Sequence, residues 1–299
     1  MNEELENLSD GALLEEISRR FNQKNASITE MEFLTKKMIQ LNEQAKAAES
    51  LQSGFLSLIK NEFNNPMSVL LLLSKKLSKG ATDEDSIVSM ASMIRRELLR
   101  LDFQLKNIFA VTEIEAGDIA NNLSYIDFNA ILEDAKDAVS YIIEEKEVEF
   151  IIENNLDEKF VSDRNKFYMI LVNLLSNAVE FSYPKENISI HVRNDDSTTY
   201  IEVTNHGEGM ENVVKNEVYN RFTQFHVGDT RESSGLGLGL SVVRSFVDSL
   251  EGEVDYSCEK GVTKFWVILP MITENSDNNV DSDDVFFDDF DDDGDTVSL

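Results

Sequence analysis

A long stretch with helical periodicity and almost no proline, from about residue 28 to about residue 115, most constrains how this chain folds. It contains one of the three prolines of the chain, Pro66. In its first part apolar residues recur at alternating spacings of three and four, the pattern of a coiled-coil seam that continues through Phe55 and Ile59: Met31, Leu34, Met38, Leu41, Ala45 and Ala48. Lys79-Gly80 should end this helix, since glycine suits the position just past a last turn.

A second helix is expected to begin near Asp83–Asp85 and to end at Glu115-Ala116-Gly117. Its apolar face comprises Ile87, Met90, Ile94, Leu98, Leu101, Leu105 and Ile108. Two long helices joined by one short loop form an antiparallel hairpin. Because a lone hairpin cannot bury both of its faces, the sequence predicts a homodimer built around a four-helix bundle.

From about residue 121 short strand-like runs alternate with helical ones. The expected strands are Val148–Ile152, Ile188–Arg193, Tyr200–Thr204, Gly252–Ser257 and Thr263–Leu269, and the expected helices are Phe128–Glu145, Lys166–Phe181 and Leu238–Leu250. This mixture predicts an α+β sandwich with helices on one face of a mixed sheet. We therefore expect a short helical segment in residues 1–27 (around Gly11–Phe21), the hairpin in 28–118, the sandwich in 121–270 and a disordered acidic tail in 271–299.

The charge of the chain excludes two classes of partner. With 27 Lys+Arg and 57 Asp+Glu the net charge is 27 − 57 = −30. Residues 271–299 hold 11 of the acidic residues and no Lys or Arg, so residues 1–270 carry −30 + 11 = −19. Nucleic acid and anionic membrane surfaces are disfavoured, because both need a basic footprint. The lone Cys258 and the lack of any apolar run near ~20 residues predict a cytoplasmic protein without membrane insertion.

The run Gly235-Leu236-Gly237-Leu238-Gly239-Leu240-Ser241, which opens a helix, is the strongest chemical signal. Glycines at alternate positions let the backbone approach phosphate groups, and a helix N-terminus adds a favourable dipole. A flexible loop without a ligand is the alternative interpretation of this run.

Asn173 and Asn177 form a second signal, because residues four apart project from one face of a helix. A buried Asn pair on an apolar helix is costly unless it binds something, and a carboxamide oxygen is a suitable ligand for Mg²⁺. A helix cap or a solvated face is the alternative, which the flanking leucines and valine argue against.

Two weaker runs complete the set: Val203-Thr204-Asn205-His206-Gly207-Glu208-Gly209-Met210 and Phe222-Thr223-Gln224-Phe225. In this order the four motifs resemble the ATP-binding domain of sensor histidine kinases, within the superfamily shared with gyrase, Hsp90 and MutL. The resemblance covers about residues 121–270.

The resemblance implies a site for ATP with Mg²⁺. By analogy Asn177 is the metal ligand, Asn173 sits beside it, and Asn205, where the family usually has aspartate, faces the adenine amino group. Gly207 and Gly209 border the base, and Phe222 and Phe225 precede a lid at about 227–234. The phosphates are bordered by Gly235, Gly237 and Gly239. An Asn at position 173 cannot take a proton, so a gyrase-like hydrolytic ATPase is not expected.

The hairpin extends the resemblance through Phe55 to Pro66, which looks like the phosphoacceptor box of the family. Glu62, Asn65 and Pro66 keep its pattern, but the phosphoacceptor histidine is replaced by Asn61. A conjugated carboxamide nitrogen cannot replace the imidazole nucleophile, so autophosphorylation at this position is excluded.

Charge near the nucleotide also departs from the family. Glu180 stands where the family often has Lys or Arg. Lys185, Arg221 and Arg231 are the candidates for replacement charge.

Three functions follow as alternatives. The first is a histidine-kinase-type ATP-dependent phosphotransferase that acts in trans, on a heterodimer partner or a phosphotransfer protein. The second is a pseudokinase that docks a response-regulator receiver domain or another histidine kinase, with ATP as a conformational ligand or with residual phosphatase activity through Glu62 and Asn65. The third is a scaffold whose acidic tail, with Phe286, Phe287 and Phe290, binds a partner; a merely solubilising tail is its plainer alternative.

Overall fold

A computed structural model of the chain describes residues 36–38, 57, 59–60, 62–80, 83–117, 119–156, 160–195, 197–207, 217–223 and 235–271. The chain divides into two compact units, Met1–Lys60 and Asn61–Leu299. In the first unit the described residues, 36–38, 57 and 59–60, are helical. The expected N-terminal helix, most of the coiled-coil seam, Asn61, Gly209, Phe225, the lid and tail residues 272–299 lie outside the described residues.

Both helices of the hairpin end where the sequence predicts. The first is helical over residues 62–78 and closes in a turn at Lys79 and Gly80, where Gly80 has a φ of +87° that glycine adopts at little cost. The second, α2 (Glu84–Ala116), is capped by Asp83, whose carboxylate accepts a hydrogen bond from the Ser86 backbone N–H at 2.7 Å. It ends at Gly117, which is also left-handed, with a φ of +74°.

The predicted apolar face of α2 is largely exposed within one chain. Among its members only Leu101 is buried, while Leu98 is 52% exposed. The buried residues of α2 are Leu101, Gln104, Asn107, Ala110 and Val111. α2 contacts α3 (Phe128–Ala138), α4 (Ser140–Lys146) and α6 (Gly239–Ser249) of the second domain, which is the sandwich that begins at about residue 121. Its buried Gln104 also bonds to Glu62 of the first hairpin helix.

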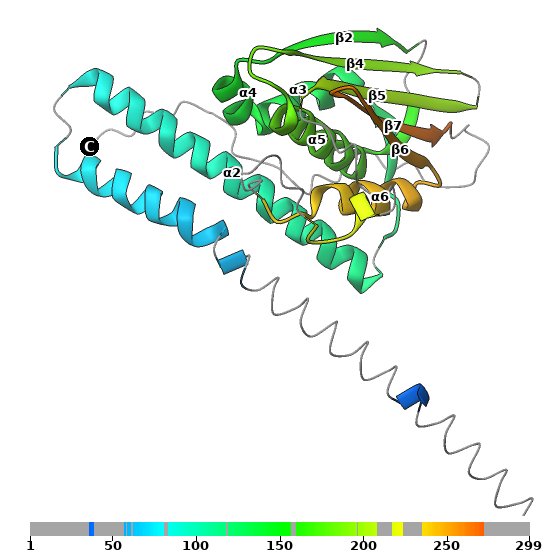
Figure 1. Ribbon diagram of the computed structural model, residues 1–299, viewed down its shortest axis with the longest axis horizontal. Helices are drawn as coiled ribbons and strands as arrows, with labels where there is room; N and C mark the ends of the chain where they lie inside the picture. The colour runs from blue at the N-terminus through cyan, green and yellow to red at the C-terminus, as the bar shows by residue number, and fades with distance from the viewer. Residues whose placement is uncertain are drawn as a thin grey trace, which may run out of the picture. The chain divides into compact units, whose positions relative to one another are not determined.

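A five-stranded mixed sheet forms the centre of the second domain, in the order β2-β4-β5-β7-β6. β2 (Glu149–Asn155) runs parallel to β4 (Asn187–Asn194), whereas β5 (Thr198–His206), β7 (Val262–Pro270) and β6 (Glu253–Glu259) pair antiparallel. Figure 1 shows α3 (Phe128–Ala138), α5 (Arg164–Phe181) and α6 (Gly239–Ser249) together on one face of this sheet. The predicted α+β sandwich is therefore confirmed.

Two features of this domain were not predicted. A second, two-stranded sheet pairs β1 (Leu123–Ile126) with β3 (Phe160–Asp163), and a short 3-10 helix, η1, covers Glu217–Tyr219. The single helix expected over Phe128–Glu145 is in fact two, because Val139 leaves the helical conformation between α3 and α4 (Ser140–Lys146). Val139 is fully buried, so this break lies against the core.

The core lies between the sheet and α5. Alternate residues of β4, Ile188, Ile190 and Val192, are fully buried, as expected for a strand with one face on the core. α5 is buried along most of its length because the sheet covers one side and α3 and α6 flank the others.

The segment that joins the hairpin to the second domain is held by the start of α5. The Lys166 ammonium donates to the backbone carbonyls of Ile119 at 2.9 Å and Ala120 at 3.1 Å, and also to the Asn121 side chain. Asp163 caps α5 and accepts the Asn122 backbone N–H at 2.8 Å. Burial lowers the pKa of Lys166.

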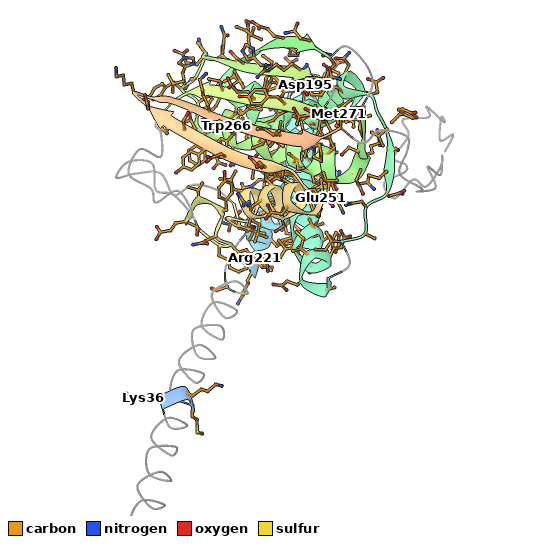
Figure 2. The ribbon with its side chains drawn as sticks, turned by 90° about the vertical axis from the view of Figure 1, so that its right-hand side faces the viewer. Lys36, Asp195, Arg221, Glu251, Trp266 and Met271 are labelled. Carbon is orange, nitrogen blue, oxygen red and sulfur yellow. The ribbon has the colours of Figure 1, made fainter. Side chains whose placement is uncertain are left out.

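The end of β7 lies beside the turn between β4 and β5, where Figure 2 labels Met271 and Asp195. The Met271 backbone N–H donates to the Ser197 carbonyl at 2.8 Å. Hydrogen bonds from Ser197 and Thr198 lower the pKa of Asp195 to about 2. The carboxylate therefore stays charged and holds this turn over the working pH range.

Two isoleucines of the sheet provide a matched test of this packing. Ile190 is fully buried on β4, whereas Ile151 is 46% exposed on the edge strand β2. We expect Ile190→Ala to lower the free energy of unfolding by about 2–5 kcal/mol, through lost burial and a residual cavity. Ile151→Ala should cost less than about 1 kcal/mol. Urea unfolding of both variants measures the difference, and equal losses would contradict the assigned core.

Candidate functional site

α5 supplies the two carboxamides that the sequence singles out. Asn173 is 2% exposed, and its amide nitrogen donates to the Met169 carbonyl one turn earlier at 2.8 Å. This bond fixes the Asn173 side chain and leaves its oxygen to face a neighbouring element. Asn177, one turn further along α5, is half-buried.

The end of β5 meets the C-terminal end of α5 at very close range. Gly207 forms a bridge with Ser182, and the Tyr183 backbone N–H donates to the His206 carbonyl at 2.9 Å. A Cβ on Gly207 would lie 1.7 Å from the Phe181 carbonyl oxygen. Only glycine permits this approach, which places Asn205, two residues earlier on β5, beside α5.

The glycine loop reaches α5 from the other end of the site. Gly235 and Gly237 have φ values of +138° and +63°, a region that other residues rarely adopt. The Gly237 carbonyl accepts the Phe222 backbone N–H at 2.8 Å, which ties the loop to the segment before it. A Cβ on Gly239, the first residue of α6, would lie 2.5 Å from the Asn173 side-chain oxygen.

The contacts of Gly239 and Gly207 with α5 show how far the site extends along this helix. Gly239 touches α5 at Asn173, and Gly207 touches it at Phe181. Eight residues of α-helix separate these points by about 12 Å. The site therefore extends along α5, with the N-terminus of α6 at one end and the end of β5 at the other.

Two buried amide nitrogens in this site have no partner. Within the part of the chain that the structure describes, neither Asn177 Nδ2 nor Asn205 Nδ2 has a hydrogen-bond acceptor. Leaving a buried donor unsatisfied costs about 1–3 kcal/mol each. A ligand rich in acceptor oxygens and nitrogens would satisfy both. The residues present therefore fit a nucleotide.

The described basic side chains that could supply replacement charge form ion pairs with acidic residues. The Lys185 ammonium lies 3.5 Å from the Glu147 carboxylate, and Arg221, labelled in Figure 2, forms an ion pair with Glu115 of α2. Arg231 lies outside the described residues. The two described candidates for replacement charge are thus already paired with acids.

Glu180 lies towards α4. Burial raises the pKa of Tyr141, a residue of α4, to about 12, and the Glu180 carboxylate is one of the nearby charges that add to this rise. The Glu180 carbonyl accepts a hydrogen bond from the Lys146 ammonium. The Glu180 carboxylate therefore lies close enough to Tyr141 to affect its pKa.

Five of the predicted nucleotide residues lie on α5 or beside it: Asn173, Asn177, Asn205, Gly207 and Gly239. Phe222 and Gly237 are joined to each other in the segment that leads to α6, and Gly235 lies two residues before Gly237. Glu62 and Asn65 lie apart from them, on the first helix of the hairpin. Among the described residues no group of three or more His, Cys, Asp or Glu side chains is arranged to hold a metal ion. Asn177 stays the Mg²⁺ ligand that the resemblance predicts.

Sequence reasoning missed the partners of Glu62. Its carboxylate accepts hydrogen bonds from the Arg100 guanidinium at 3.0 Å and from the Gln104 amide at 2.8 Å, both on α2. These residues are about forty positions away in the chain, and no local pattern marks them. Only the register of the two helices could have predicted the pairs.

Comparison with known proteins agrees with this geometry. Residues 162–273 match the family model described as histidine kinase-, DNA gyrase B- and HSP90-like ATPase. The autoinducer 2 sensor kinase/phosphatase LuxQ of Vibrio parahaemolyticus is 29% identical over 237 residues, which are 76% of this chain and 27% of that protein. The sensor-like histidine kinase SenX3 of Mycobacterium bovis is 22% identical over 227 residues, covering 76% of this chain and 55% of its own.

Among solved structures, full-length ShkA in complex with AMPPNP has a TM-score of 0.50 at 18% identity, covering 73% of this chain and 46% of that one. This likeness concerns the fold. The chain spans about a quarter to about half of the length of the curated relatives named above. In the described part of the chain, no helix is both long and apolar enough to cross a membrane.

The order of the motifs, their assembly around α5 and the matching relatives lead to one conclusion. Residues 162–273 match the ATPase-type domain found in histidine kinases, DNA gyrase B and HSP90, and 76% of the chain is similar to sensor histidine kinases.

Proposed function

We propose that the chain binds ATP with Mg²⁺ along α5 and acts in two-component signalling without phosphorylating itself at the usual position. The observation that carries the nucleotide site is the pair of buried, unpartnered amide nitrogens, Asn177 Nδ2 and Asn205 Nδ2, in a site lined by glycine backbone. On this proposal Asn177 holds Mg²⁺ and Asn205 contacts the base. The backbone at Gly235, Gly237 and Gly239, with the α6 N-terminus, holds the phosphates.

The charge of the chain makes the metal important. The body carries −19, and both Lys185 and Arg221 are paired with glutamates. A triphosphate would therefore meet few free cations in the described part of the site. Mg²⁺ supplies the missing positive charge when it is bound, and the Asn177 carboxamide supplies a neutral oxygen ligand that fits this cation.

Metal-dependent binding is the direct test. We expect MgATP to bind the full chain, and Asn177→Ala to weaken that binding at least about 10-fold, because a metal ligand is lost. The same variant should change affinity much less when EDTA replaces Mg²⁺. Isothermal titration calorimetry measures all four conditions, with Asn155→Ala on the exposed edge strand as the matched control. Equal affinities with and without Mg²⁺ in the wild-type chain would contradict the proposal.

The residue at the phosphoacceptor position, Asn61, supports either phosphoryl transfer to another protein or no phosphoryl transfer at all. Asn61 has no lone pair comparable to that of imidazole, so it cannot accept the γ-phosphoryl group. The neighbouring Glu62 carboxylate is held by Arg100 and Gln104. The chain would then phosphorylate a histidine on a phosphotransfer protein or on another histidine kinase. The alternative is a pseudokinase that docks a receiver domain and uses ATP as a conformational ligand.

Restoring the nucleophile separates these possibilities. We expect the wild-type chain incubated with γ-labelled ATP to remain unlabelled, and Asn61→His to acquire an acid-labile, base-stable label. Transfer from wild-type chain and ATP to an added phosphotransfer protein would favour the kinase acting in trans. An Asn61→His variant that stays unlabelled, without any such transfer, would favour the pseudokinase. Label on the wild-type chain would contradict the role given to Asn61.

The second alternative keeps a residual phosphatase role, for which Glu62 and the exposed Asn65 are the candidates on the hairpin. The relative LuxQ carries the name kinase/phosphatase. Loss of label from a phosphorylated receiver domain, measured beside the transfer reactions, distinguishes this activity. An unchanged label with the chain present would exclude it.

The hairpin is proposed to form a homodimer. Apolar side chains remain exposed on both helices, among them Leu71 at 67%, Leu98 at 52% and Phe109 at 55%. Exposed apolar area of this kind on two neighbouring helices is buried when a second hairpin packs against it to form a four-helix bundle.

Glutamate substitutions in the exposed apolar surface of the hairpin test whether the chain forms the proposed dimer. We expect the wild-type chain to have twice its monomer mass of 33.9 kDa in solution, and Leu98→Glu with Leu105→Glu to shift it towards the monomer, because buried charges lack partners. Ile151→Glu on the sheet edge is the control and should stay dimeric. Light scattering coupled to gel filtration gives the masses. A monomeric wild-type chain would overturn the proposed bundle.

A further inference from the structure

Asn205 lies inside the second domain, on the face of β5 that is turned to the core. Along β5 residues 199, 201, 203 and 205 are buried, while 198, 200 and 202 are not. Asn205 is 3% exposed. Its side chain is therefore on the same side of the sheet as α5 and α6.

The amide nitrogen of Asn205 has no hydrogen-bond acceptor among the described residues. Thr263 stands opposite Asn205 in the register of β7, but its hydroxyl donates to the Cys258 sulfur at 3.3 Å. A carboxamide can present either its oxygen or its NH₂ group to a ligand.

The position of Asn205 places it at the base end of the proposed site. The N-terminus of α6, which suits phosphates, meets α5 at Asn173. Asn205 precedes Gly207, which meets α5 at Phe181, about 12 Å further along the helix. A nucleotide with its phosphates at α6 therefore carries its base towards Asn205.

We propose that this site accepts 6-oxopurine nucleotides, such as inosine and guanosine triphosphates, about as well as ATP, because Asn205 presents a hydrogen-bond donor as well as an acceptor. The inference rests on the proposed nucleotide site. A carboxylate at this position could only accept, so it would suit the amino group of adenine and oppose the carbonyl of a 6-oxopurine. Asn205 donates to that carbonyl, and the same bond gives its buried nitrogen the acceptor it lacks.

Inosine triphosphate is the cleanest probe, because it exchanges the 6-amino group for a carbonyl without adding the 2-amino group of guanine. We expect the full-length wild-type chain to bind MgITP within about 10-fold of MgATP. In Asn205→Asp the preference for ATP over ITP should rise to about 100-fold or more, since two acceptors then face each other. Asn155→Asp, which adds the same charge on the edge strand, should leave the ratio unchanged. Guanosine triphosphate shows whether the 2-amino group is also tolerated.

The outcomes separate this inference from the proposed function. An ATP preference of about 100-fold or more in the wild-type chain overturns the inference and leaves the nucleotide site standing. An ATP-to-ITP ratio that does not change in Asn205→Asp does the same. Binding of none of the three nucleotides overturns the proposed function and the inference with it. The wild-type ratio needs no variant, so the test holds even where Asn205→Asp fails to fold.

Discussion

The burial of α5 is the constraint on which the site depends. This helix lies between the sheet and its flanking helices, so a polar side chain on it must be bonded inside the protein or turned to a ligand. The Asn173 amide donates a hydrogen bond to the Met169 carbonyl, whereas the Asn177 amide nitrogen has no acceptor among the described residues. The two ends of the site are occupied by Gly207 and Gly239, because only a residue without Cβ lets β5 and α6 approach α5 so closely. The polar interior of the site is therefore a consequence of packing around one helix.

The strongly acidic composition then limits how such a site can hold a polyanion. The described cations nearby are drawn into pairs, Lys185 with Glu147 and Arg221 with Glu115. Among the described residues, the groups left for phosphate are backbone N–H groups, the dipole of α6 and neutral carboxamides. These groups hold a nucleotide well only where a divalent cation offsets its charge. The composition and the site architecture both support the proposed dependence on metal.

Features with a local cause could be predicted from the sequence. The ends of the hairpin helices follow from Gly80, Asp83 and Gly117, and the long strands follow from alternating apolar residues. Features with a distant cause could not. The four-residue strands β1 and β3 are too short to show a period, and Val139 breaks a helix without proline or glycine because it packs into the core. The Glu62 pairs depend on the register between two helices, and the unbonded state of Asn205 depends on what Thr263 does across the sheet.

Asn61 of the hairpin and Asn205 of the second domain are alike in one chemical property, a neutral carboxamide side chain. By resemblance to the family, each replaces an ionisable group, an imidazole in one case and a carboxylate in the other, by a neutral carboxamide. At position 205 the surrounding glycine contacts and the buried face of β5 are intact, so the loss concerns charge and not the shape of the site. In the hairpin the adjacent Glu62 is tied to α2 by Arg100 and Gln104, so its carboxylate serves the packing of the two helices. On the proposed function, the chain would keep the architecture that holds a nucleotide and would lack the nucleophile of the hairpin.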